Sequence, residues 1–121
     1  MKILIVEDSM LYRKAIVKYL KPHLDSSEFI LAKDGEEGLE LYKKENPDYV
    51  LLDLLLPKMT GQEVLKAINK LDKKKPKIIV ISADVQKIVK EEVKELGAIK
   101  FINKPFTEAK AKKVAEQIKG E

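Results

Sequence analysis

One carboxylate interrupts the most apolar stretch of the chain. Between Tyr49 and Pro57, Asp53 stands among seven residues that are otherwise apolar or aromatic. An ionised carboxylate in an apolar setting costs several kcal/mol unless other groups compensate its charge. We therefore expect Asp53 to lie at the exposed end of a buried strand, with neutralising groups supplied by other parts of the chain.

The length of the chain suits one domain. Its 121 residues, 45% of them hydrophobic, are enough for a single core, and we predict one domain over residues 1–121 with no effector domain. No apolar run is long enough to span a bilayer, and Met1 and Lys2 lead directly into a strand-like run rather than a signal peptide. The prediction is a cytoplasmic protein without membrane insertion, and we expect a monomer.

The composition excludes several kinds of site. The chain has no cysteine and a single histidine, His23, which excludes disulfides, thiolate chemistry and multi-histidine metal sites. We expect His23 to be a solvated residue at a helix end. Acidic and basic residues are mixed along the chain, with a net charge of +4, which is typical of a solvated surface and argues against direct nucleic-acid binding. The dense lysine run at 73–75 and Lys77 is interpreted in the same way, as a solvated loop.

Short apolar runs alternate with amphipathic segments along the chain. The apolar runs predict strands over residues 2–6, 28–32, 48–53, 77–82 and 98–103. The amphipathic segments predict helices over residues 10–20, 35–44, 61–70, 85–96 and 107–118. Expected helix caps are Ser9, Asp34, Thr60 and Thr107, and Gly97 is the expected stop after the fourth helix. Helical spacing places Leu11 and Ile88 among the inward-facing residues.

Strands that alternate with helices through short connections predict an α/β fold with a parallel sheet and right-handed crossovers. We predict a flavodoxin-like (βα)5 three-layer sandwich whose five strands follow the order 2-1-3-4-5. In such sheets, ligands bind beyond the carboxyl ends of the strands, here between the first and third. The polar residues at these ends are Glu7, Asp8, Asp53, Ser82, Asn103 and Lys104.

Three carboxylates at one sheet edge call for a cation. Glu7, Asp8 and Asp53 would raise one another's pKa unless a positive ion lay among them. Because the candidate ligands are all oxygen atoms, Mg²⁺ is the expected ion. Asp53, beside a metal and Lys104, would be a nucleophile that forms an aspartyl-phosphate, with Ser82 and Lys104 contacting the phosphoryl oxygens.

Each of these residues also has a simpler explanation. The acidic pair would cap a helix, Ser82 would cap a strand end, Lys104 would be solvated, and Asp53 would cap the following loop. That explanation gives no reason why all four strand ends carry complementary groups. The combination is therefore more specific than its parts.

The motifs Glu7-Asp8, Asp53 with the loop to Gly61, Ser82-Ala83 and Lys104-Pro105 together resemble the receiver domain of response regulators in two-component signalling. The resemblance covers essentially the whole chain. It implies Asp53 as phosphoacceptor, Asp8, Asp53 and the Leu55 backbone carbonyl as direct Mg²⁺ ligands, Glu7 as an acidic partner acting largely through water, Ser82 as the hydroxyl switch and Lys104 as the phosphate contact. A cis Lys104–Pro105 bond is also implied.

The resemblance draws attention to three more positions. Phe101 stands where the family has an aromatic residue that turns inward when the hydroxyl moves, and the alternative is a plain core aromatic. Leu55 and Asp84 each lie two residues beyond a site residue, where the family tunes hydrolysis of the phosphate. Asp84 would either order the attacking water or repel the phosphate of a donor, and the sequence leaves the sign of its effect open.

The expected function is a phosphorylation-controlled switch. A phosphohistidine on a sensor histidine kinase would give its phosphoryl group to Asp53, and Mg²⁺-dependent hydrolysis would reset the protein. Such a protein catalyses its own phosphorylation and dephosphorylation without being a conventional enzyme. The resemblance suggests that a downstream protein binds the surface of residues 85–96, 98–103 and 107–118. That surface would present Lys87, Lys90, Glu91, Lys94, Lys100 and Lys110, which suits an acidic partner.

Several functions remain open at this point. We favour a role in chemotaxis over that of a phosphorelay intermediate handing phosphate to another protein, although the sequence does not separate them. A flavodoxin-like small-molecule-binding domain would need a Gly-rich or Ser/Thr-rich loop after the first strand, where this chain has Glu7-Asp8-Ser9. A docking module that is never phosphorylated would be expected to lack part of the site, yet no expected acidic, hydroxyl or lysine group is missing.

Overall fold

The computed structural model describes residues 1–71 and 76–120. Its strands are β1 (Lys2–Val6), β2 (Glu28–Ala32), β3 (Tyr49–Leu52), β4 (Lys77–Ser82) and β5 (Ala98–Asn103). Its helices are α1 (Met10–Leu20), α2 (Gly35–Glu45), α3 (Gly61–Lys70), α4 (Lys87–Glu95) and α5 (Glu108–Lys119). The predicted alternation of strands and helices is confirmed.

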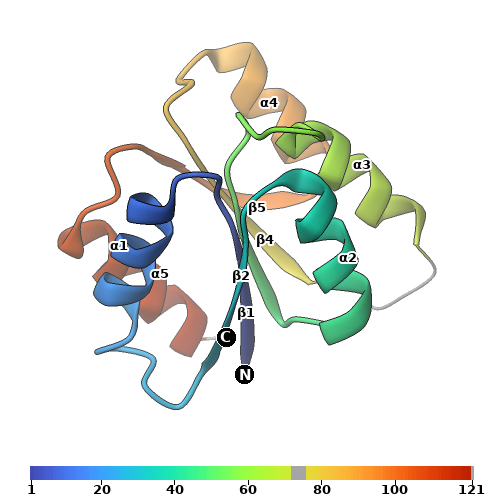
Figure 1. Cartoon of the computed structure of the whole chain (residues 1–121). Coiled ribbons are helices and arrows are strands. Elements are labelled where there is room, and N and C mark those ends of the chain that lie inside the picture. The colour runs from blue at the N-terminus through green and yellow to red at the C-terminus, as the bar shows by residue number, and fades with distance from the viewer. Residues whose placement is uncertain (72–75, 121) are drawn as a thin grey trace.

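The strands form one parallel sheet in the order β2-β1-β3-β4-β5, which confirms the predicted order. Helices α1 and α5 cover one face, and α2, α3 and α4 cover the other (Figure 1). Since β1 lies between β2 and β3, the chain reverses its winding direction beside β1. The carboxyl ends of β1 and β3 therefore open onto the same crevice.

Both faces of the sheet are buried, because side chains alternate along each strand. On β1, Ile3 and Ile5 join the core under α1 and α5, whereas Leu4 and Val6 join the core on the other face. The two cores share no side chain, so the sheet separates them. This explains why the strands are continuous apolar runs in the sequence.

The predicted caps form. Ser9, Asp34, Thr60 and Thr107 each accept a hydrogen bond from a backbone N–H in the first turn of the helix that follows, and Thr60 completes a capping box with Glu63. Gly97 follows α4 with a φ of +106°, a left-handed conformation that glycine adopts without strain.

Two predicted inward residues are wrong. Leu11 is 79% exposed, because the inward stripe of α1 runs through Tyr12, Ile16 and Leu20 instead. Ile88 is 72% exposed, and Val93 is the buried residue of α4. A helix of two or three turns carries more apolar residues than its inward face can use, so spacing alone leaves the rotation of the helix undetermined.

The fourth helix begins at Lys87 rather than at residue 85. The Gln86 N–H donates to Asp84 Oδ1 at 3.1 Å, a local turn that keeps Gln86 extended before the helix starts. Among the described residues, no helix has the length and apolar character needed to cross a membrane. The lysine run 73–75 lies outside the described residues, while Lys77 is exposed as expected.

Candidate functional site

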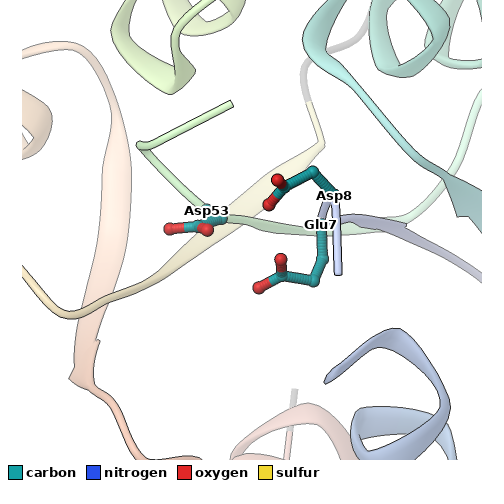
Figure 2. Close-up of side chains that lie close together, drawn as sticks. All are labelled: Glu7, Asp8 and Asp53. Atoms are coloured by element: carbon teal, nitrogen blue, oxygen red, sulfur yellow. The ribbon is translucent and has the colours of Figure 1, made fainter. Parts of the chain in front are cut away.

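Three carboxylates meet where β1 and β3 end. The register pairs Val6 with Leu52, so the residues that follow, Glu7 and Asp53, leave the sheet side by side. Glu7, Asp8 and Asp53 each offer an oxygen that lies within 4.8 Å of the other two. Figure 2 shows the Glu7 and Asp8 side chains projecting toward the side on which Asp53 lies. The predicted convergence of these strand ends is therefore observed.

The three acids differ in their burial. Glu7 and Asp53 are 2% and 5% exposed, whereas Asp8 is exposed to solvent. Asp53 Oδ1 accepts a hydrogen bond from the Leu54 N–H at 2.8 Å, and Glu7 Oε2 accepts one from the Ser9 N–H at 3.0 Å. Main-chain donors thus fix the orientation of the two buried carboxylates.

Lys104 neutralises the two buried acids. It follows β5 directly, and its Nζ lies 2.7 Å from Glu7 Oε1 and 3.1 Å from Asp53 Oδ2. The Lys104–Pro105 peptide bond is cis, as the resemblance implied. The pairing with Asp53 agrees with the sequence-based expectation, but the shorter contact is the one with Glu7, which no sequence pattern indicated.

A tyrosine completes the surroundings of the lysine. The Lys104 ammonium lies 4.2 Å from the centroid of the Tyr12 ring, and the Tyr12 hydroxyl accepts a hydrogen bond from the Phe106 N–H at 2.7 Å. Sequence reasoning missed Tyr12, because an aromatic residue on the inward side of a helix is usually only a core residue. Through these two contacts, Tyr12 links α1 to the chain that follows β5.

Burial and charge raise the pKa of both Glu7 and Lys104, for different reasons. Desolvation raises the pKa of Glu7 above its ordinary value of 4.5, and the hydrogen bonds from Lys104 and Ser9 only partly offset this. For Lys104, desolvation lowers the pKa, but the hydrogen bond to Glu7 and the charge of Asp53 outweigh it, so that the pKa lies above 10.5. The lysine therefore stays charged at neutral pH, whereas the raised pKa of Glu7 favours the protonated form of that carboxyl.

Replacing Glu7 with Gln should remove a pH dependence of stability. Because the folded pKa of Glu7 is raised, the folded state binds more protons than the unfolded state between pH 4.5 and that pKa. The stabilisation that the protonated Glu7 carboxyl provides is complete below pH 4.5 and is lost as the pH rises through the folded pKa. Over that range the free energy of unfolding falls by at most about 1.4 kcal/mol per pH unit. Urea unfolding in chelator across this range should show the slope in wild type and not in Glu7→Gln.

Glu63→Gln is the matched control. Hydrogen bonds from Thr60 lower the pKa of Glu63, so its contribution is present above 4.5 and is lost as the pH falls through the lowered folded pKa. The two variants should therefore change the pH profile in separate windows. An unchanged slope above pH 4.5 in Glu7→Gln would contradict the burial argument.

The loop after Asp53 is fastened on two sides. A Cβ on Gly61 would lie 2.5 Å from the Asp53 carbonyl oxygen, so only glycine allows α3 to begin this close to the strand. On the other side, the Gly35 N–H donates to the Pro57 carbonyl at 3.4 Å, and Lys58 pairs with the buried Asp34 at 3.7 Å. Leu55, in the same loop, is 67% exposed.

Ser82 ends β4 and is fully buried. The register pairs Leu52 with Val80, which brings Ser82 beside the strand end that carries Asp53. The Ser82 Oγ accepts a hydrogen bond from the Asp84 N–H at 3.2 Å. The Asp84 carboxylate in turn accepts from the Gln86 main chain at 3.1 Å and from its side chain at 3.4 Å, so it is occupied within its own loop.

Phe101 lies apart from the carboxylates. It is half-buried on β5 and packs against the core on the α4 side of the sheet, with the Lys90 ammonium 5.4 Å from its ring centroid. The structure thus brings Glu7, Asp8, Asp53 and Lys104 together in one cluster. Ser82 lines its edge, whereas Phe101, Asp84 and the Leu55 side chain are outside the cluster.

The donor set fits a hard divalent ion. The three carboxylates offer oxygens at ligand separation, and the exposed Asp8 leaves the site accessible from solvent. Among the described residues, Lys104 is the ion-pair partner of Glu7 and Asp53, and one positive charge does not balance three carboxylates, so a cation would relieve the remaining repulsion. Glu7, Asp8 and Asp53 are the groups that would hold Mg²⁺.

Comparisons of the sequence with known proteins agree with one another. The sequence model described as "Response regulator receiver domain" matches residues 3–116. Protein CcdB of Bacillus subtilis is 34% identical over 122 residues, an alignment that covers 98% of this chain and 98% of CcdB. The alkaline phosphatase synthesis transcriptional regulatory protein PhoP of Bacillus subtilis is 37% identical over 108 residues. That alignment covers 88% of this chain but 43% of PhoP, so the chain spans less than half of this relative.

Solved structures show the same fold. Chemotaxis response regulator CheY4 of Vibrio cholerae superposes with a TM-score of 0.86 at 29% identity, covering 97% of each chain. A response regulator receiver domain protein described as CheY-like, from Methanospirillum hungatei, gives a TM-score of 0.84 at 27% identity and covers 98% of this chain and 90% of its own.

Proposed function

This chain belongs to the response regulator receiver domain family, and on that premise we propose that it is a phosphorylation-activated signalling switch. It accepts a phosphoryl group on Asp53 in a Mg²⁺-dependent reaction and signals through altered binding to another protein. The observation that carries the proposal is the convergence of Asp53 with two further carboxylates and one lysine from separate strand ends.

The chemical step is a displacement at phosphorus. A carboxylate oxygen of Asp53 attacks the phosphorus of a phosphohistidine on a sensor histidine kinase. The O–P bond forms, the N–P bond breaks, and the ring, which carries a proton on its other nitrogen, leaves as neutral imidazole. Later, water attacks the same phosphorus, releases inorganic phosphate and restores the Asp53 carboxylate. Bound Mg²⁺ would neutralise charge on the phosphoryl oxygens during both steps.

Groups of the protein orient the Asp53 carboxylate and neutralise charge on the phosphoryl oxygens. The Leu54 N–H and the Lys104 ammonium each hold one oxygen of Asp53, so the carboxylate is oriented before a donor arrives. In the phosphorylated protein, Lys104 pairs with one phosphoryl oxygen and the Ser82 hydroxyl donates to another, which requires Ser82 to move. Leu55 and Asp84 flank the approach of the hydrolytic water, and Phe101 responds to the movement of Ser82.

The test is incubation of the purified protein with a small acyl phosphate, with Mg²⁺ or with chelator, followed by intact mass measurement. We expect the mass of one phosphoryl group to be gained in Mg²⁺ and its gain to be at least about 100-fold slower in chelator, because removing a metal clamp leaves the transition-state charge unbalanced. Equal labelling in both conditions would contradict the metal dependence, and no labelling in either would contradict the phosphoacceptor.

The proposed output surface lies on α4, β5 and α5. Between α4 and β5 is a hollow of about 300 Å³ bordered by three lysines, Lys90, Lys94 and Lys100, and floored in part by Phe101. The apolar side chains of Ile88 and Ile99, 72% and 45% exposed, lie on the same two elements. An acidic partner with an apolar centre fits this surface. Lys87 is already paired with Glu91 at 3.9 Å, and Lys110 with the Asn103 and Pro105 carbonyls, so these two lysines contribute less.

A further inference from the structure

Arg13 is the only arginine among the 24 basic residues of the chain. It stands in the first turns of α1, half-buried, and its guanidinium is directed at the turn that carries the acidic pair. One nitrogen, Nη1, donates to the Glu7 carbonyl at 2.7 Å and to the Asp8 carbonyl at 3.1 Å. The single arginine thus binds the main chain of the two acids that precede α1.

Further hydrogen bonds stabilise the turn between β1 and α1. The Ser9 N–H donates to the Glu7 carboxylate, the Ser9 hydroxyl accepts from the Tyr12 N–H at 3.2 Å, and the Arg13 N–H donates to the Ser9 carbonyl at 2.9 Å. Without Arg13, two consecutive carbonyls would lose their side-chain donor. Each carbonyl defines the plane of a peptide, and the two planes set the directions in which the Glu7 and Asp8 side chains leave the backbone.

Lysine would not replace this contact. A guanidinium is planar and always charged, and it presents its donors in a fixed arrangement, whereas an ammonium is a compact, strongly hydrated charge on a flexible stem. In the described part of the chain, Arg13 makes no ion pair within 4.0 Å of a carboxylate, so its role at the site is not charge neutralisation. Its contacts are with backbone geometry.

We propose that Arg13 is a positioning residue for the metal site: it fixes the turn between β1 and α1 so that the carboxylates of Glu7 and Asp8 stay within ligand distance of Asp53. The inference rests on the proposed function, because it assigns Arg13 to the same Mg²⁺ site. Partners that orient metal ligands without touching the metal contribute substantially to metal affinity.

The charge of Arg13 and its contacts with the backbone predict opposite changes in Mg²⁺ affinity when Arg13 is replaced. A fixed positive charge near a divalent site repels the ion, so removing it by Arg13→Gln would tighten Mg²⁺ binding if charge were all that mattered. If Arg13 positions the ligands, the same substitution weakens binding. The sign of the change therefore separates the two roles.

Mg²⁺ binding would be measured by isothermal titration calorimetry on the full chain as wild type, Arg13→Gln, Arg13→Lys and Lys14→Gln. We expect about tenfold weaker binding for Arg13→Gln, the lower end of what such supporting residues contribute. Arg13→Lys keeps the charge and should also bind more weakly than wild type. Lys14→Gln removes an exposed charge from the neighbouring position on α1 and should bind as tightly as wild type or slightly more tightly.

Melting temperatures in chelator show whether each variant is folded before titration. If Arg13→Gln fails to fold, Arg13→Lys carries the test, because it retains the charge and most of the stem. Unchanged or tighter binding in Arg13→Gln, or full wild-type affinity in Arg13→Lys, would overturn the positioning role. Those outcomes would leave the proposed function intact, whereas a wild type that binds no Mg²⁺ would overturn the metal site itself and the inference with it.

Discussion

Replacing Asp53 with Asn is expected to abolish phosphoryl acceptance. The amide that replaces the carboxylate has no negative charge and is a far weaker nucleophile, so no acyl phosphate forms at this position. In Mg²⁺ and a small acyl phosphate, intact mass should show one phosphoryl group on wild type and none on Asp53→Asn. Mapping of the labelled peptide in wild type should place the group on the segment that contains Asp53.

Asp34→Asn is a suitable control for this substitution. Asp34 is the other buried aspartate among the described residues, 5% exposed, and it caps α2 through the Glu37 N–H. Asparagine caps helices about as well as aspartate, and the 3.7 Å pair with the exposed Lys58 that it removes is weak, so the fold and the loop after Asp53 should be retained. The control should be labelled like wild type. Equal labelling of Asp53→Asn would show that another residue is the acceptor.

Replacing Lys104 with Met should destabilise the metal-free protein by about 2–3 kcal/mol. Methionine keeps an apolar stem beside Tyr12 but leaves the Glu7 and Asp53 carboxylates, 2% and 6% exposed in their side chains, without their counterion. Removing one partner of a buried ion pair typically costs about 3–5 kcal/mol. We expect less than this typical cost because the Lys104 side chain is 19% exposed, so water partly screens its charge. Urea unfolding at neutral pH in chelator measures the change.

Mg²⁺ should restore much of the stability that Lys104→Met loses, because a bound cation neutralises the same carboxylates and binds only the folded state. The matched control is Lys87→Met, which breaks the exposed pair with Glu91 at 3.9 Å and should change stability by less than about 0.5 kcal/mol. A Lys104→Met protein as stable as wild type in chelator would show that the ammonium is not needed to balance the buried acids.

The sequence predicted the order of elements and the sheet because the patterns that define them are local. Each strand is a short apolar run buried on both faces, and each cap is a side chain bonded to a backbone group three residues away. The rotation of the helices was not predictable in the same way. Leu11 and Tyr12 are adjacent in the sequence and either could face inward, and the hydrogen-bond partner of Tyr12, the Phe106 N–H, is 94 residues away in sequence.

The sequence predicted which residues of the site lie close together, because parallel strands end at one edge of the sheet and the polar residues follow those ends. How the residues pair depends on distances of a few tenths of an ångström between side chains from different strands. That Lys104 lies closer to Glu7 than to Asp53, and that Glu7 is buried while Asp8 is exposed, are facts of this kind. No sequence pattern predicted the contacts of Arg13 with the Glu7 and Asp8 carbonyls, although Arg13 is the only arginine in the sequence.

The loop after Asp53 makes the two walls of the crevice unequal in stiffness. The wall formed by residues 54–61 is fastened to the start of α2 by Pro57 and Lys58 and to the strand by the close approach of Gly61. It cannot swing outward without lifting the first turn of a neighbouring helix. The opposite wall, residues 83–86, has side-chain hydrogen bonds that join only residues two apart. Local opening free energies should therefore be lower there. If Ser82 changes its partner on phosphorylation as proposed, the more easily opened segment 83–86 would accommodate that movement. This segment leads directly into α4, whereas the more rigid loop 54–61 would keep Asp53 in place.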